Sequence, residues 1–493
     1  MNILNLPKKT SFILILILVV FFLKGVLLSS SFGIFGGQDE ARHYNTIQHL
    51  AEPDGIVRNQ QKPDIQDRET FAQYNFSEEI LGVATATGID ALKTDIFNTN
   101  KFTMSYIGEN EDLINEKNWK PYNLTTPIDA AYGGIQLYHK FATIFEQLLS
   151  NQTMLVRFYV IRIISVLLGA LLVWFSFLIA INIGLSEKKA LLIAAIIAFQ
   201  PRFSIYFSSI NYDVFLIPMF TLFTLTGILM LKQGLTLKNI ILFIISISIA
   251  ISVKTTGYIT LVPLAFLLTF LFYKKIQHQN RHIRNAFYFF TTIAFFGLIF
   301  FLTNHIPNKG TNFFEILTTI KNYIDKSLTM GRFALSSRTY WGTLGWTNSW
   351  LMDNITNLIW FIQTFSVIGL GIIFFSKTKY PKHLPEKKYL IFLIGMIIAL
   401  QLGIRTADWA GYSNSGSLDI GTPGRYFLPN LAAHIILVFV GLGMLFEWLS
   451  LKFKLRAGTG EKLLDWSLIA SLILMFSFST YLIFNVIIYR FYL

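Results

Sequence analysis

The sequence predicts an all-α polytopic membrane protein, and three observations lead to that fold class. Hydrophobic residues make up 53% of the 493 residues and charged residues only 14%, which is more apolar than a soluble globular domain. Apolar runs long enough to cross a bilayer as helices recur along the chain. Short polar loops separate these runs, and every second loop is basic. We therefore expect one integral-membrane domain over residues 1–493, in contact with membrane lipids.

The apolar runs predict about 11 transmembrane helices. The first run, Ser11–Leu28, contains one charged residue, Lys24. We interpret it as a retained anchor, because it is longer than the apolar core of a signal peptide and no clear cleavage site follows. The other predicted spans are Met154–Ile183, Ala190–Ser209, Val214–Leu231, Asn239–Val253, Gly257–Tyr273, Ala286–Thr303, Ile355–Ser376, Tyr389–Ile404, Phe427–Leu449 and Trp466–Tyr489.

Loop charge predicts a cytoplasmic N-terminus. In that orientation every inner loop carries lysine or arginine, as at Lys188-Lys189 and Lys387-Lys388, which agrees with the positive-inside rule. The formal net charge of +13 therefore reflects membrane orientation, and no nucleic-acid partner is expected. Abundant Ile, Lys, Asn and Phe favour a bacterial source, so we expect a multi-pass plasma-membrane protein. The predicted extracytoplasmic loops are 29–153, 305–354 and 405–425.

The first extracytoplasmic loop, 29–153, is expected to be large and partly helical. Its apolar residues recur at helical spacing in Ala41–Leu50, Ser77–Leu92 and Ala130–Leu149. Two interpretations stay open: the loop packs as a helical cap over the mouth of the bundle, or it is a solvated addition with no part in chemistry.

Ionisable residues gather on the predicted outer face. Gly37-Gln38-Asp39-Glu40-Ala41-Arg42-His43 follows the first span, Asp213 begins a later one, Lys254 separates two short spans, and Arg425 follows a Gly-Thr-Pro-Gly loop. Charged groups near lipid usually face water, protein or substrate, so these residues are candidates for a site. Structural alternatives remain, because acidic residues stabilise helix N-termini and isolated basic residues anchor to lipid headgroups.

Several motifs and chemistries are absent from the sequence. It has no P-loop, no glycine-rich dinucleotide motif and no HExxH. With no cysteine, the chain can form no disulfide, no thiolate metal site and no cysteine nucleophile. The sequence therefore offers no recognisable motif for binding a nucleotide or a nucleotide sugar.

An Asp-Glu pair after the first helix, a second acidic residue at the next outer loop and a large first loop resemble the GT-C superfamily. Its members are integral-membrane glycosyltransferases that use polyprenyl-phosphate-linked sugars, and they include the protein O-mannosyltransferases and the lipid A aminoarabinose transferases. Four stretches are also similar to a bacterial family of membrane proteins of unassigned function: Gln38-Asp39-Glu40 with His43, Ser208–Asp213, Lys254 with Tyr258, and Gly424–Pro429. The later motifs of the mannosyltransferases are not evident, so the resemblance does not identify the acceptor.

The resemblance implies a role for each candidate residue. Asp39 would accept the proton of the acceptor hydroxyl, with Glu40 as its partner. Asp213 and His43 would bind the acceptor or act as a second acid. Phosphate binding by a planar guanidinium points first to Arg425. Further donor-phosphate candidates are Lys254, Arg202 and Arg42. A divalent cation held by Asp39 and Asp213 is a further expectation, although no ligand spacing is diagnostic.

The sequence therefore predicts a membrane glycosyltransferase that moves a sugar from a polyprenyl-phosphate carrier to an unidentified hydroxyl acceptor. The transfer would occur at the extracytoplasmic face, in the assembly of cell-surface glycans or glycoconjugates. One alternative is a transporter, or a protein that translocates lipids or glycans, whose polar residues line a pathway. A second alternative is a scaffold without catalytic activity. Transporters place ionisable residues near the membrane midplane and show repeated halves. Here the polar residues gather at one face and no internal repeat is evident, which favours the transferase.

Overall fold

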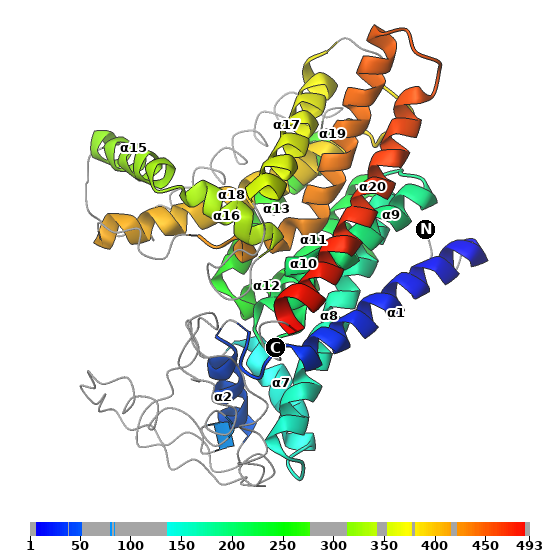
Figure 1. The fold of residues 1–493 in the computed structure, drawn as a ribbon. Coiled ribbons are helices and arrows are strands. Elements are labelled where there is room, and N and C mark those ends of the chain that lie inside the picture. Colours follow the sequence, from blue (N-terminus) through cyan, green and yellow to red (C-terminus); the bar gives the residue numbers. More distant parts are fainter. Residues whose placement is uncertain are drawn as a thin grey trace.

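The computed structural model describes residues 6–37, 39–51, 79–80, 83, 136–276, 313–342, 353–376, 380–415 and 422–488. Within these residues the chain consists of helices and contains no strand (Figure 1). The helices are α1 (Lys8–Ser31), α2 (Glu40–Ala51), α7 (Leu137–Leu148), α8 (Met154–Asn182), α9 (Glu187–Phe199), α10 (Pro201–Phe207), α11 (Asp213–Gln233), α12 (Leu237–Val253), η3 (Thr255–Thr260), α13 (Leu261–Ile276), α15 (Phe313–Thr329), α16 (Arg332–Trp341), α17 (Asp353–Phe375), α18 (Lys387–Ser415), η4 (Gly424–Asn430), α19 (Leu431–Lys452), α20 (Thr459–Tyr481) and η5 (Leu482–Ile488).

Among the described residues, 7 helices are long and apolar enough to cross a membrane: α1, α8, α11, α17, α18, α19 with η4, and α20 with η5. The bent pair α9 and α10 makes up to 8 if it is one span, and α12 and η3 with α13 are shorter apolar helices. Each predicted span overlaps one or two of these elements except Ala286–Thr303, which lies outside the described residues. The prediction of an all-α polytopic membrane protein is confirmed.

The predicted span Ala190–Ser209 is broken into two helices that meet at 62°. Proline at the start of α10 has no N–H to continue the ladder of α9. Lys24, the one charge of the first span, secures the break. Its Nζ donates to the carbonyl of Ala198 and, at 2.6 Å, to the hydroxyl of Ser204. The turn directs α10 and the segment before α11 toward the end of the bundle that holds Asp39.

The helices alternate in direction, so their connections fall at two ends of the bundle. At one end, Thr10 at the start of α1 contacts Glu187 on α9, and Lys188 Nζ lies 2.7 Å from Asp465 on α20. At the other end, the connection from α1 to α2, the connection from α10 to α11, and η4 come together beside α2 and α7 (Figure 1). This division agrees with the predicted alternation of loops, while the side that faces the cytoplasm stays a prediction.

Helices α2 and α7 pack together beside the N-terminal end of α8. A buried polar network holds them together: Tyr44 on α2 donates to Glu146 on α7 at 3.0 Å, and Arg157 on α8 donates to Glu79 at 2.6 Å and to Glu146. The amphipathic stretches Ala41–Leu50 and, in part, Ala130–Leu149 are thus confirmed as α2 and α7. Of Ser77–Leu92, only residues 79, 80 and 83 are described.

Candidate active site

Asp39 ends the connection between α1 and α2 and carries the least satisfied carboxylate of the site. Its backbone has φ of +56°, a left-handed conformation that Asp tolerates better than most residues. Oδ1 is buried and has no hydrogen-bond partner in the described chain, and Oδ2 lies 3.9 Å from Nη2 of Arg425. Burial raises the pKa of Asp39, while Arg425, Arg42 and Lys254 oppose that rise. A buried carboxylate whose pKa is raised, and one of whose oxygens has no hydrogen-bond partner in the described residues, can accept a proton.

Glu40, the neighbouring carboxylate, is fully engaged. Both of its oxygens accept from the guanidinium of Arg162 on α8, at 2.8 and 2.6 Å. The backbone N–H groups of Gly37 and Ile210 also donate to it, each at 2.8 Å. Arg162 in turn donates to the carbonyls of Ser29, Phe32 and Gly33. This buried pair ties the end of α1, the Asp39 connection, α8 and the segment before α11 into one unit, so Glu40 positions the site.

The helix-cap alternative for the acidic pair finds no hydrogen bond in the described residues. Glu40 accepts from Gly37 and Ile210, neither of which belongs to α2, and Asp39 Oδ1 accepts from no group. The hydrogen bonds of Glu40 therefore join neighbouring segments, while its place in the first turn of α2 still allows a favourable interaction with the helix N-terminus.

Asp213, at the start of α11, is paired with Lys254 at the end of α12. Lys254 Nζ lies 3.0 and 3.3 Å from the two Asp213 oxygens, and the Tyr206 hydroxyl donates to Asp213 Oδ2 at 2.7 Å. The Lys254 ammonium is also 4.6 Å from the ring centres of both Tyr212 and Tyr426. A carboxylate and two aromatic faces thus hold one half-buried cation in place.

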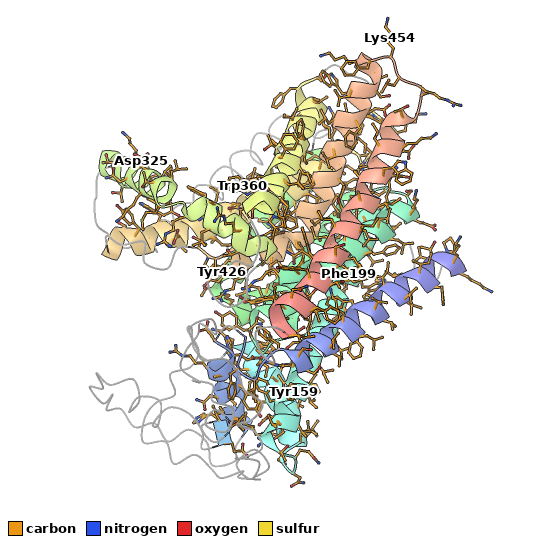
Figure 2. All side chains as sticks on the ribbon, viewed as in Figure 1. Tyr159, Phe199, Asp325, Trp360, Tyr426 and Lys454 are labelled. Carbon is orange, nitrogen blue, oxygen red and sulfur yellow. The ribbon has the colours of Figure 1, made fainter. Side chains whose placement is uncertain are left out.

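Arg425 lies in η4 and approaches the site from the other half of the chain. Gly424 before it packs directly on α16, since a Cβ there would lie 2.1 Å from the Tyr340 backbone nitrogen. The Arg425 guanidinium lies 5.0 Å from the ring centre of Tyr426 and donates to its hydroxyl at 3.4 Å. Tyr426 therefore contacts both Arg425 and Lys254, and Figure 2 shows it at the end of the bundle that faces α2.

The remaining basic candidates surround this centre. Arg202 on α10 is buried against Tyr206, 5.4 Å from its ring centre, and is close enough to Arg425 for the two charges to interact. Arg42 on α2 is half-buried and interacts with the charge of Asp39. Among the described residues, the cluster thus sets the cations Arg42, Arg202, Lys254 and Arg425 against the carboxylates Asp39 and Asp213, an excess of positive charge suited to an anion.

His43, one turn after Asp39 on α2, is hydrogen-bonded to His139 on α7. Nδ1 of His43 lies 3.0 Å from Nε2 of His139. The His43 ring also contacts Tyr212 edge to face, with the two ring centres 4.8 Å apart. The site therefore brings together all eight residues that the sequence singled out: Asp39, Glu40, Arg42, His43, Arg202, Asp213, Lys254 and Arg425. Their roles stay predictions.

The described residues do not fit a divalent cation at Asp39 and Asp213. Asp213 already pairs with the Lys254 ammonium, and Asp39 faces the Arg425 guanidinium, so a metal would have to displace fixed positive charge. No group of three or more His, Asp or Glu side chains in this part of the chain could hold a metal ion. The reaction proposed below therefore uses only side chains of this chain.

Sequence reasoning missed Arg162, His139 and the tyrosines that hold Lys254. Arg162 carried a signal, because an arginine inside an apolar span needs a buried partner. His139 carried none, since its contact joins segments far apart in the sequence: His139 and His43 are separated by 96 positions. Tyr212 and Tyr426 lie in two of the matched stretches, but nothing in the sequence shows that they contact Lys254.

Residues 131–307 match the family model of dolichyl-phosphate-mannose-protein mannosyltransferases, a GT-C family. The matched region runs from α7 to α13 and includes Asp213 and Lys254, whereas Asp39 and Arg425 lie outside it. No curated protein and no solved structure shows significant similarity to the chain. The match supports the GT-C superfamily, and with it a multi-pass membrane glycosyltransferase that uses a polyprenyl-phosphate-linked sugar. The finer resemblance to the bacterial family of unassigned function stays a prediction.

Proposed function

We propose that the chain transfers a sugar from a polyprenyl-phosphate carrier to a hydroxyl acceptor, and that the cluster around Asp39 is its reaction centre. The observation that carries this proposal is the environment of Asp39: one buried carboxylate oxygen without a partner among the described residues, next to a cluster with excess positive charge. The transfer needs a base and a cationic site for the departing phosphate, and these two requirements correspond to the two features.

In the proposed reaction, the acceptor hydroxyl gives its proton to Asp39 as its oxygen attacks the anomeric carbon. The bond between that carbon and the phosphate oxygen breaks, and the electron pair leaves with the phosphate. The carrier phosphate carries one negative charge as a diester and up to two once released. Arg425 and Lys254, held by Tyr426 and Asp213, are positioned to stabilise the added charge.

Glu40 and Asp213 act indirectly in this proposal. Glu40 holds the Asp39 connection through Arg162, and Asp213 fixes the Lys254 ammonium. Arg202 and Arg42 add to the positive field that attracts the phosphate. We further propose that the site faces the extracytoplasmic side of a bacterial plasma membrane, as loop charge predicts, and that the product enters a cell-surface glycan or glycoconjugate.

Purified protein in lipid nanodiscs tests the proposal. Polyprenyl phosphates bearing different sugars are incubated with extracted cell-envelope acceptors, and release of free polyprenyl phosphate is followed by mass spectrometry. We expect acceptor-dependent release by wild type and by Asp325→Asn, an exposed carboxylate on α15 far from the site (Figure 2). Release should be lost in Asp39→Asn. Equal release by Asp39→Asn and wild type would refute the assignment of the reaction centre.

A cellular comparison identifies the product. Glycans and glycoconjugates from cells with and without the protein are compared by mass spectrometry, and complementation with wild type or Asp39→Asn separates transfer from a scaffold role. A glycan that Asp39→Asn restores as well as wild type does would exclude transfer by this centre.

A further inference from the structure

The His43 and His139 pair borders the site, and neither step above uses it. The two rings stack with centres 5.3 Å apart and share a hydrogen bond of 3.0 Å. Only 4% of His43 and none of the His139 surface are exposed. Buried polar atoms are usually hydrogen-bonded, so the groups around the two rings decide which ring nitrogen carries each proton.

The backbone fixes the tautomer of both rings. The N–H of Gln136 donates to Nδ1 of His139 at 3.1 Å, so that nitrogen carries no proton. A neutral His139 therefore carries its proton on Nε2 and donates it to Nδ1 of His43. His43 must then carry its own proton on Nε2. This relay makes the free edge of His43 a hydrogen-bond donor.

The donating edge of His43 points away from α7, because its other nitrogen is directed at α7. The charged groups that act on the ring are Arg42 on its own helix, Arg425 on η4 and Lys254 at the end of α12, in addition to the neighbouring His139 ring. In the described part of the chain, no group accepts a hydrogen bond from Nε2 of His43.

Both rings are neutral near pH 7. Burial, His139 and the surrounding cations hold the pKa of His43 well below its ordinary value, and burial lowers the pKa of His139 to about 4. A charged His43 would be repelled by Arg425, Lys254 and Arg42, whereas a neutral N–H adds a directional contact without adding charge.

We propose that His43 donates its Nε2–H to a phosphate oxygen of the lipid-linked donor, and that His139 is a positioning residue that fixes the donating tautomer. The inference rests on the proposed function, because the phosphate is that of the polyprenyl carrier. Arg425 and Lys254 supply the charge that attracts the phosphate, and His43 supplies a bond of fixed direction on the side of α2.

Lipid binding measured in nanodiscs tests the role of His43. The probes are polyprenyl phosphate and the uncharged polyprenol of the same chain length. Wild type should prefer the phosphate, and His43→Leu should lower that preference about ten-fold or more through loss of a hydrogen bond to a charged group. His43→Gln retains an N–H donor and should lose less. The matched control His49→Leu, in the last turn of the same helix, should keep the wild-type preference.

Nitrogen NMR on histidine-labelled protein reads the tautomer directly. Between about pH 5.5 and 8, His43 should keep its proton on Nε2, and that signal should move with polyprenyl phosphate but not with polyprenol. His139→Phe, which keeps an aromatic ring but donates no hydrogen bond, should allow both tautomers of a still neutral His43. A proton on Nδ1 of His43, or an equal response to both lipids, would overturn the inference.

The outcomes separate the two proposals. If wild type binds both lipids equally, the proposed donor site itself is wrong. If wild type prefers the phosphate and His43→Leu does so to the same degree, only the role of His43 is wrong. If His43→Leu fails to fold, the wild-type NMR response to the two lipids decides the matter alone.

Discussion

Asp39→Asn separates the chemistry of the site from its stability. Asn matches Asp in shape and accepts the left-handed backbone at φ of +56°, but it takes up no proton. Loss of a general base typically lowers the rate by about 10² to 10⁴, which corresponds to about 3 to 5.5 kcal/mol of barrier. We expect turnover to fall within that range.

The stability of Asp39→Asn should be equal to or greater than that of wild type. The raised pKa of Asp39 means that burial of the charged carboxylate outweighs its attraction to Arg425, Arg42 and Lys254. Because the folded-state pKa lies above the unfolded one, this carboxyl favours the folded protein most at low pH and less as pH rises through the folded value. Any gain in Asp39→Asn should therefore appear near neutral pH and vanish in acid.

Donor binding by Asp39→Asn should also persist. Removal of one carboxylate increases the excess of positive charge near Arg425, so affinity for polyprenyl phosphate should hold or rise. Turnover is measured by release of polyprenyl phosphate, stability by thermal unfolding in nanodiscs, and affinity by lipid binding, with Asp325→Asn as control. A wild-type rate, or a rate loss matched by loss of folded protein, would refute the reasoning.

Four further predictions follow from the same contacts. Arg425→Lys should keep part of the activity and Arg425→Ala should lose about 2 to 3 kcal/mol of phosphate stabilisation, visible as a fall in donor affinity or turnover of roughly 30-fold or more. Activity should decline as pH falls through the pKa of Asp39, and in Arg425→Gln this acid limb should move to higher pH, since the cation that lowers that pKa is gone; an unmoved limb would separate the two residues. Glu40→Gln should cost about 3 to 5 kcal/mol of stability by leaving a buried arginine without its carboxylate, and a melting temperature equal to wild type would contradict the positioning role. In intact cells an impermeant maleimide should label Gln152→Cys at once and Arg456→Cys only after permeabilisation, whereas the reverse pattern would invert the predicted topology.

Much of the fold was predictable because membrane helices are specified locally. Twenty or so apolar residues form a helix in lipid whatever the rest of the chain does, since every backbone group must be satisfied within the segment. The break between α9 and α10 was not found, because hydropathy measures how apolar a run is and not its direction. Pro201 was a visible signal for it, while the contact of Lys24 with Ala198 and Ser204 spans more than 170 positions.

The residues that form the site were predictable from the sequence, but the contacts and role of each residue were not. Ionisable residues next to lipid are few, so the requirement that each face protein or substrate selected Asp39, Asp213, Lys254 and Arg425. What each one does depends on partners far away in the sequence. Arg162, which engages Glu40, lies 122 positions along the chain, and no local pattern links the two.

The carboxylates of Asp39 and Glu40 are adjacent in the sequence but have opposite hydrogen-bonding environments, which supports the proposed centre. Glu40 receives two bonds from Arg162 and two from backbone N–H groups, which leaves its oxygens no role beyond holding segments together. Asp39, one residue earlier, has a buried oxygen that accepts no hydrogen bond from the part of the chain that the structure describes. An unsatisfied buried acceptor is costly, and it persists only where the surrounding structure enforces it. The Glu40 and Arg162 unit supplies that enforcement, so the stability of one carboxylate would maintain the reactivity that we propose for the other.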